Sequence, residues 1–99
     1  GSLTMQKIDV KSPEIKEYVD VLKLLAHPIR FSIALTLYRN KVLNVGAIQE
    51  ALELPQSTVS QHISKMRESG IVEADREGTK IFYTLSNEIA NKVIKNLMA

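Results

Sequence analysis

The sequence predicts one mainly α-helical domain with a small β-hairpin, and three observations support this fold class. Apolar residues recur at helical spacing through most of the chain. Two short segments near the C-terminal end alternate apolar and polar residues around a glycine, as hairpin strands do. The chain has 99 residues, of which 44% are hydrophobic and 24% charged, so its length and composition suit one globular domain.

The first 13 residues are predicted to lie outside this domain, which then covers residues 14–99. Gly1 to Thr4, in front of Met5, resemble a remnant of cloning. The residues that follow, up to Pro13, are expected to form a polar arm.

Helices are predicted where apolar residues recur every three or four positions behind a capping residue. Ser12 precedes a first helix over residues 14–25, whose two apolar stripes indicate one contact with the core and another with a partner. His27 stands at the entry of a second helix over residues 28–38, which is apolar enough to be central and buried. The remaining helices are predicted over residues 45–52 (capped by Asn44), 56–69 (ended by Gly70) and 87–98 (capped by Ser86).

Two strands are predicted over residues 71–75 and 80–85, joined by a four-residue link that contains Gly78. The hairpin directly follows two helices that a short turn connects. The order is therefore α-α-α-α-β-β-α, which describes a winged helix-turn-helix.

Composition excludes several classes of protein. The absence of cysteine rules out a disulfide scaffold, a thiolate metal site and a catalytic thiol, and it suits a reducing compartment. No apolar run reaches the roughly 18 residues of a membrane span, and no secretory signal pattern is present. The formal net charge of +2 is too small to indicate a nucleic-acid partner, so such a function must be argued from the local placement of charge.

The helix predicted over residues 56–69 has an unusual exposed face. Val59, Ile63 and Met66 take its inner face, and no acid occurs from Leu54 to Arg67. Hydroxyl, amide and imidazole groups crowd its N-terminal half, where a merely solvated helix would use Glu and Lys. Groups of this size suit base edges and phosphates. The candidate DNA-contacting residues of this helix are Gln56, Ser57, Thr58, Ser60, Gln61, His62, Lys65 and Arg67. The alternative is an exposed polar helix without a partner.

The hairpin supplies two further candidates, Arg76 and Lys80, which flank its tip and could reach phosphates or a minor groove. Residues 55–67 carry a charge of +2, whereas residues 68–80 carry two cations and four acids, or −2. The acids must therefore point away from any DNA. The alternative is that both cations are ordinary solvated charges.

Several strings of the chain resemble the ArsR/SmtB family of bacterial winged-helix repressors. They are Leu24-Leu25-Ala26-His27-Pro28-Ile29-Arg30, Leu54 to His62, Ser69-Gly70-Ile71-Val72 and Gly78 to Tyr83, within a match from about Lys23 to Leu85. The resemblance implies a homodimer that binds an imperfect palindrome of double-stranded DNA and represses transcription in the bacterial cytoplasm, at the nucleoid when bound. It places Ser57, Thr58, Ser60, Gln61 and His62 in the major groove and Arg76 and Lys80 in the wing contact.

The resemblance also implies that the first and last helices form the dimer interface. Both helices carry more apolar residues than a three-helix core needs, which favours an interface over ordinary core packing. The expected interface residues are Ile15, Tyr18, Val19, Leu22, Ile89, Val93, Ile94 and Leu97.

The chain departs from the metal-sensing members of the family. Asn44-Val45-Gly46 stands where those members have Cys-Val-Cys, and the last helix contains Glu88 but no histidine. His27 and His62 are too far apart in sequence to indicate a zinc site. We therefore expect no metal, no cofactor and, since no catalytic motif is present, no enzyme activity. Two alternatives stay open: a winged-helix module for protein–protein contact, and a repressor with an unrecognised metal or small-molecule inducer.

Overall fold

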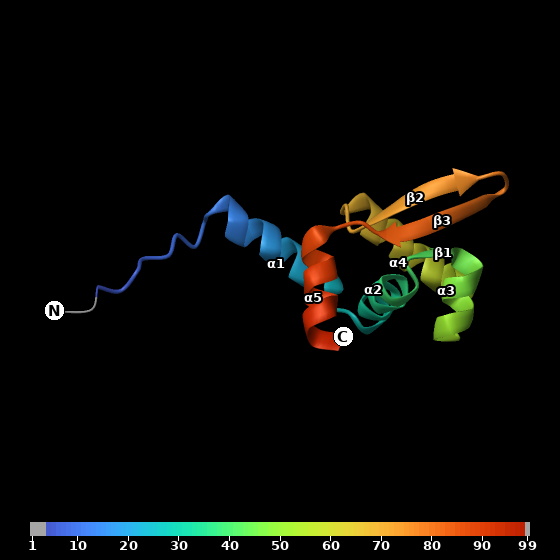
Figure 1. Cartoon of the computed structure of the whole chain (residues 1–99), viewed down its shortest axis with the longest axis horizontal. Helices are drawn as coiled ribbons and strands as arrows, with labels where there is room; N and C mark the ends of the chain where they lie inside the picture. The colour runs from blue at the N-terminus through green and yellow to red at the C-terminus, as the bar shows by residue number, and fades with distance from the viewer. Residues whose placement is uncertain (1–3, 99) are drawn as a thin grey trace.

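The computed structural model describes residues 4–98, which form five helices and three strands (Figure 1). The suggested cloning remnant lies mostly outside these residues. Within residues 4–98 no single helix has the length and apolar content to cross a membrane. The helices Pro13–Leu25 and Pro28–Asn40 meet these two criteria only when they are taken together, and they are bent by 100° relative to each other. The elements are α1 (Pro13–Leu25), α2 (Pro28–Asn40), β1 (Val42–Asn44), α3 (Val45–Leu52), α4 (Gln56–Glu68), β2 (Val72–Glu77), β3 (Lys80–Leu85) and α5 (Glu88–Met98).

Helix α2 is the centre of the fold, as its apolar sequence predicts. It packs against α1, α3, α4, α5 and strand β3. Ile33, Ala34 and Leu37 on α2 are buried together with the three inward residues expected on α4, each at most 2% exposed. A helix surrounded by neighbours needs no polar face, which explains why apolar residues occur all around α2.

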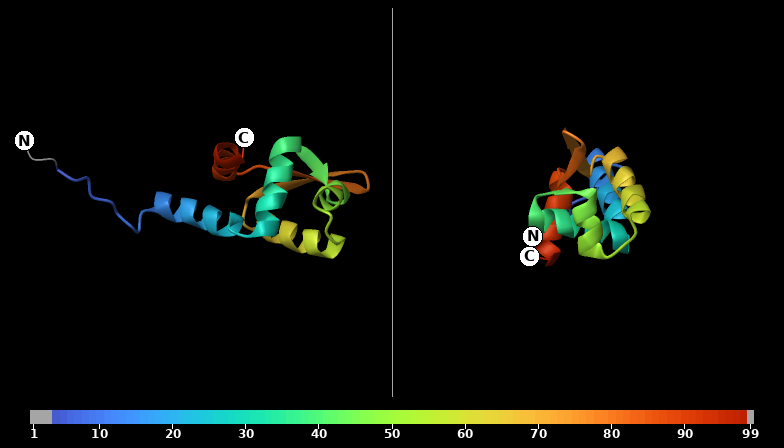
Figure 2. Two further views of the ribbon diagram at one scale, coloured as in Figure 1. Left: turned by 90° about the horizontal axis from the view of Figure 1, so that it is seen from below. Right: turned by 90° about the vertical axis from the view of Figure 1, so that its right-hand side faces the viewer.

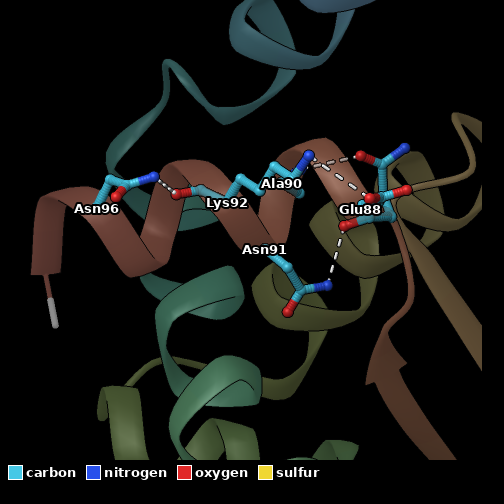
Figure 3. Close-up of polar contacts among 6 residues, drawn as sticks. Glu88, Ala90, Asn91, Lys92 and Asn96 are labelled. Carbon is cyan, nitrogen blue, oxygen red and sulfur yellow. Dashed lines mark hydrogen bonds and ion pairs between the residues drawn. The ribbon is translucent and has the colours of Figure 1, made fainter.

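The helix starts follow local capping chemistry. Ser12, His27 and Asn44 each accept a hydrogen bond from a backbone N–H two or three residues later, at 2.8–3.2 Å, as predicted. The expectation for the last helix is wrong by one residue. Asn87, not Ser86, caps α5, because its Oδ1 accepts the N–H of Ala90 at 2.9 Å. Polar side chains continue along α5, where Asn96 donates to the carbonyl of Lys92 (Figure 3).

The sheet contains a strand that the sequence did not predict. Strand β1 pairs antiparallel with β3, so the order is β1-β3-β2. The hairpin link is also shorter than expected, since the strands pair as far as Glu77 and Lys80 and leave only Gly78 and Thr79 between them. Gly78 has a φ of 63°, and glycine at this position allows a two-residue turn, so Arg76 and Glu77 stay in the strand.

Helix α1 projects from the body of the molecule and leads into the arm (Figure 1). Only the second half of α1 has buried residues, namely Val21, Leu24 and Leu25. The arm carries three exposed apolar side chains, Met5, Ile8 and Val10. Together the arm and α1 give the described chain a length of 64 Å against widths of 24 and 20 Å.

Candidate nucleic-acid interface

Helix α4 is presented on the surface by a tight turn. Its inner face packs against α2 and α3. Glu53 ends α3 in the left-handed conformation, with a φ of 53° and a ψ of 45°, and Leu54 and Pro55 lead into α4. Pro55 stands at the N-cap, and no side chain accepts the first N–H groups of α4. These N–H groups and the helix dipole favour an anion such as a phosphate at that end.

The candidate residues of α4 differ in exposure. Gln56, Ser57, Gln61, Lys65 and Arg67 are exposed. The side chains that share the edge of the inner face are half-buried, and these are Thr58, Ser60 and His62. The exposed group thus has two amides and a hydroxyl in the N-terminal two turns of α4 and two cations in its last turn. Amides and hydroxyls suit contacts with base edges, and cations suit contacts with phosphates.

His62 has a neighbour that the sequence did not reveal. Its ring centroid lies 4.7 Å from that of His27, with the planes at 44°. Burial lowers the pKa of His62 below its ordinary value of 6.5, and the positive charges of His27, Arg30 and Lys65 lower it further. The contact fixes the side of α4 against the start of α2, so part of the His62 ring is occupied within the subunit.

Arg30 lies near enough to His62 of α4 for its charge to act on that imidazole, and the sequence predicted no role for it. Its Nε donates to the carbonyl of Leu24 at 2.6 Å, which holds the junction between α1 and α2. The sequence could have predicted this role. A cation in the first turn of a helix is unfavourable next to the helix dipole, so its presence at Arg30 indicates a contact outside that helix.

The wing has two unlike faces. Paired strand residues share a face, and neighbours along a strand alternate between faces. Glu73, Asp75 and Glu77 therefore share one face with Lys80, which stands opposite Glu77. Arg76 lies on the other face, the one that covers the helices through buried Val72 and Leu85 further along the hairpin. The register thus separates Arg76 from the acids and leaves Lys80 among them.

The cations of α4 and the wing are not tied to carboxylates. In the described part of the chain the two ion pairs are Lys16–Asp20 at 2.8 Å on α1 and Lys92–Glu88 at 3.5 Å on α5. No ion pair among the described residues therefore occupies these cations, but Arg67 lines a pocket together with Glu73 and Asp75, and Lys80 shares a strand face with three acids. Lys65 and Arg76 are thus the cations least opposed by neighbouring acids.

A second exposed surface is apolar and lies on α1 and α5. Tyr18, Val19 and Leu22 on α1 are 38–48% exposed, and Leu97 on α5 is 67% exposed. Three more of the expected interface residues are half-buried, and these are Ile15, Ile89 and Val93. Ile94 does not belong with them: it has no exposed surface, because it faces the core of the subunit with Ala90 one turn earlier.

Residues 4–98 contain no group of three His, Cys, Asp or Glu side chains that could hold a metal ion. Asn44, for which the resemblance implies the position of a metal-sensing cysteine, accepts the N–H of Ala47 at 2.8 Å and caps α3. The two histidines, although close, are surrounded by the cations Arg30 and Lys65, which oppose the binding of a metal cation.

A helix-turn-helix followed by a hairpin wing defines the class of winged helix-turn-helix domains, and here the second helix is polar and has no acid before its last residue, Glu68. A family model described as a helix-turn-helix domain matches residues 25–74. The chain belongs to the ArsR/SmtB family of winged-helix transcriptional repressors. It is 42% identical over 83 residues to the transcriptional repressor PagR of Bacillus anthracis, covering 84% of this chain and 83% of PagR. The crystal structure of PagR matches with a TM-score of 0.79 over 85% of this chain and 95% of that chain.

Two other relatives support this placement. The biofilm growth-associated repressor of Agrobacterium fabrum is 34% identical over 99 residues, which is all of this chain and 81% of that protein. The solution structure of Mb0332 from Mycobacterium bovis, described as a homodimeric winged helix-turn-helix DNA-binding domain, is 26% identical with a TM-score of 0.75, over 95% of this chain and 86% of that one.

Proposed function

We propose that this protein is a sequence-specific repressor that binds an imperfect palindromic operator as a homodimer, without a metal cofactor and without enzyme activity, in the bacterial cytoplasm and at the nucleoid when bound. One observation carries the proposal: the helix-turn-helix presents a helix that has no acid from Gln56 to Arg67, before Glu68 at its end, and whose exposed side is rich in short hydrogen-bonding groups. The similarity to proteins named as repressors supports the same reading.

The exposed residues of α4 take different roles in this proposal. Ser57 and Gln61 are exposed in the N-terminal half, where a recognition helix meets base edges, and a glutamine amide can pair with adenine in two hydrogen bonds. Lys65 and Arg67 contact phosphates. In the wing we favour Arg76 over Lys80 as the contact, because Lys80 shares its face with three acids.

Dimerisation supplies the second half-site. A second copy of the chain would cover the apolar surface of α1 and α5 that one subunit leaves exposed. A two-fold axis there places the two α4 helices on half-sites about 10–10.5 bp, or a multiple, apart.

Fluorescence anisotropy with DNA from the protein's own upstream region and with random DNA of equal length tests the roles. Gln61→Ala should weaken binding to the upstream DNA by about 1–3 kcal/mol and leave random DNA nearly unchanged. Lys65→Ala should weaken both alike and lower the salt slope by about 1. Lys92→Ala, an exposed lysine of α5, is the matched control and should change neither.

Equal losses on both DNAs for Gln61→Ala would remove that residue from base reading. Failure of the wild type to bind either DNA at physiological salt would refute the repressor assignment. It would favour the protein–protein module instead.

A further inference from the structure

A pocket of about 440 Å³ lies where α2 ends, between that end, the last residue of β3 and α5. It is lined by Leu37, Tyr38, Arg39, Lys41, Leu85 and Asn91. Figure 2 shows α2 crossing the molecule, with its first residues beside α4 and its last residues on the far side. The pocket is therefore separate from the proposed DNA-binding surface, and its volume is in the range of small-ligand sites.

The lining has the chemistry of an anion site with an apolar floor. Arg39 and Lys41 supply two exposed cations, neither of which takes part in the ion pairs of the described residues. Leu37 and Leu85 are buried and form apolar wall, and Tyr38 adds an aromatic ring. No acid lines the pocket. Paired cations beside apolar surface suit a small molecule with an anionic group on an apolar body.

The backbone at Lys41 is strained in a way that a simple helix end does not require. Lys41 has a φ of 69° and a ψ of −58°, a conformation unfavourable for any residue with a Cβ. Glycine is the usual residue at positive φ after a helix. A lysine at this position places an ammonium group at the pocket, although its backbone is strained. Strained backbone conformations of this kind are common at ligand-binding sites.

Asn91 connects the pocket to the wing. Its Nδ2 donates to the carbonyl of Asn87 at 2.9 Å within α5 (Figure 3) and to the carbonyl of Leu85 at 2.7 Å, so one amide joins α5 to the end of β3. Both hydrogens of Nδ2 are thus used within the fold, and an anion that took the place of the Leu85 carbonyl as acceptor would break this link between the wing and α5. At the other end of α2, His27 contacts His62 of α4.

We propose that this pocket is a regulatory site for a small organic anion, whose anionic group binds Arg39 and Lys41 and whose occupancy weakens DNA binding. The second part rests on the proposed function; the first does not. The shared ligand chemistry is a carboxylate or phosphate on an apolar ring or chain.

Binding is tested on the free protein by two-dimensional NMR, with benzoate and phenyl phosphate as probes and benzamide as the neutral control. Both anions should shift the Lys41 backbone amide and the Asn91 side-chain amide saturably, whereas benzamide should not. Arg39→Gln and Lys41→Gly should abolish the shifts, and Lys11→Gln, in the arm, should not. Lys41→Gly should be at least as stable as the wild type, because glycine relieves the strained backbone, so its loss of binding cannot reflect unfolding. The absence of saturable shifts, or equal shifts in Arg39→Gln, overturns the site.

Regulation is tested by anisotropy with the upstream DNA at constant ionic strength. A saturating anion should raise the Kd of the wild type by at least about fivefold and leave that of Arg39→Gln unchanged. Normal DNA binding that no anion alters overturns the regulatory role and leaves the repressor assignment intact. Conversely, a protein that binds no DNA refutes the repressor while the NMR titration still decides the site.

Discussion

Replacing Leu22 by aspartate should break the homodimer. Leu22 is 48% exposed in the single subunit, so a partner can cover about half of a leucine side chain. Full burial of leucine contributes about 1.5–3 kcal/mol, and half of it therefore contributes about 1 kcal/mol per copy, or about 2 kcal/mol for the symmetric pair. Leaving an aspartate at the same interface adds a desolvation cost of at least about 1 kcal/mol per pair. The total of about 3 kcal/mol corresponds to a dimer weakened by about 100-fold or more.

Sedimentation velocity over a range of concentrations measures this loss, and circular dichroism shows whether the subunit stays folded. Ile8→Asp, which places the same charge on the exposed arm, is the control and should leave the dimer intact. In DNA binding, Leu22→Asp should lose affinity for a full palindrome but not for a half-site, because the two half-sites are no longer linked. An unchanged dimer would refute the interface. Val93→Asp is a poorer probe, because Val93 also packs against the core of its own subunit.

Three further results are expected from local structure. Asn87→Ala should lower the free energy of unfolding by about 1 kcal/mol in urea titration, and Ser86→Ala by much less; equal losses would contradict the assignment of Asn87 as the cap. Gly78→Val should destabilise the hairpin by about 1–2 kcal/mol because of the positive φ, and an unchanged Tm would speak against the two-residue turn. The lowered pKa of His62 means that the native state binds fewer protons than the unfolded state. The free energy of unfolding should therefore fall as the pH drops below about 7 toward the native pKa, and it should fall less in His62→Gln. Identical pH profiles for the two proteins would exclude His62 as the cause.

Helix positions could be predicted because their signals are local. Spacing of apolar residues and caps such as Ser12 and Asn44 act within one or two turns, and the structure places the helix ends within two residues of the expected positions. Strand β1 could not be predicted, since its three residues are too few to show an alternating pattern and are held by pairing with β3, some forty residues later. The cap of α5 was misplaced because two consecutive residues, Ser86 and Asn87, both suit that role.

The candidate interface was predictable in composition but not in geometry. The polar residues of α4 and the absence of acids from Gln56 to Arg67 are visible in the sequence, whereas the contact of His27 with His62 depends on how α2 crosses α4. The faces of Arg76 and Lys80 depend on strand register, and a four-residue link would have left them undefined. The pocket beside Lys41 depends on three elements that meet only in the fold.

The division of charge across the hairpin bears on how the molecule would meet DNA by diffusion. The face with Glu73, Asp75 and Glu77 is repelled by the polyanion, whereas Arg76 on the opposite face is attracted. A subunit that arrives turned the wrong way is pushed off before short-range contacts form, and one that arrives correctly is drawn in. The acids of the wing would thus favour encounters in which the face with Arg76 points toward the DNA, and this effect on orientation would be strongest at low ionic strength.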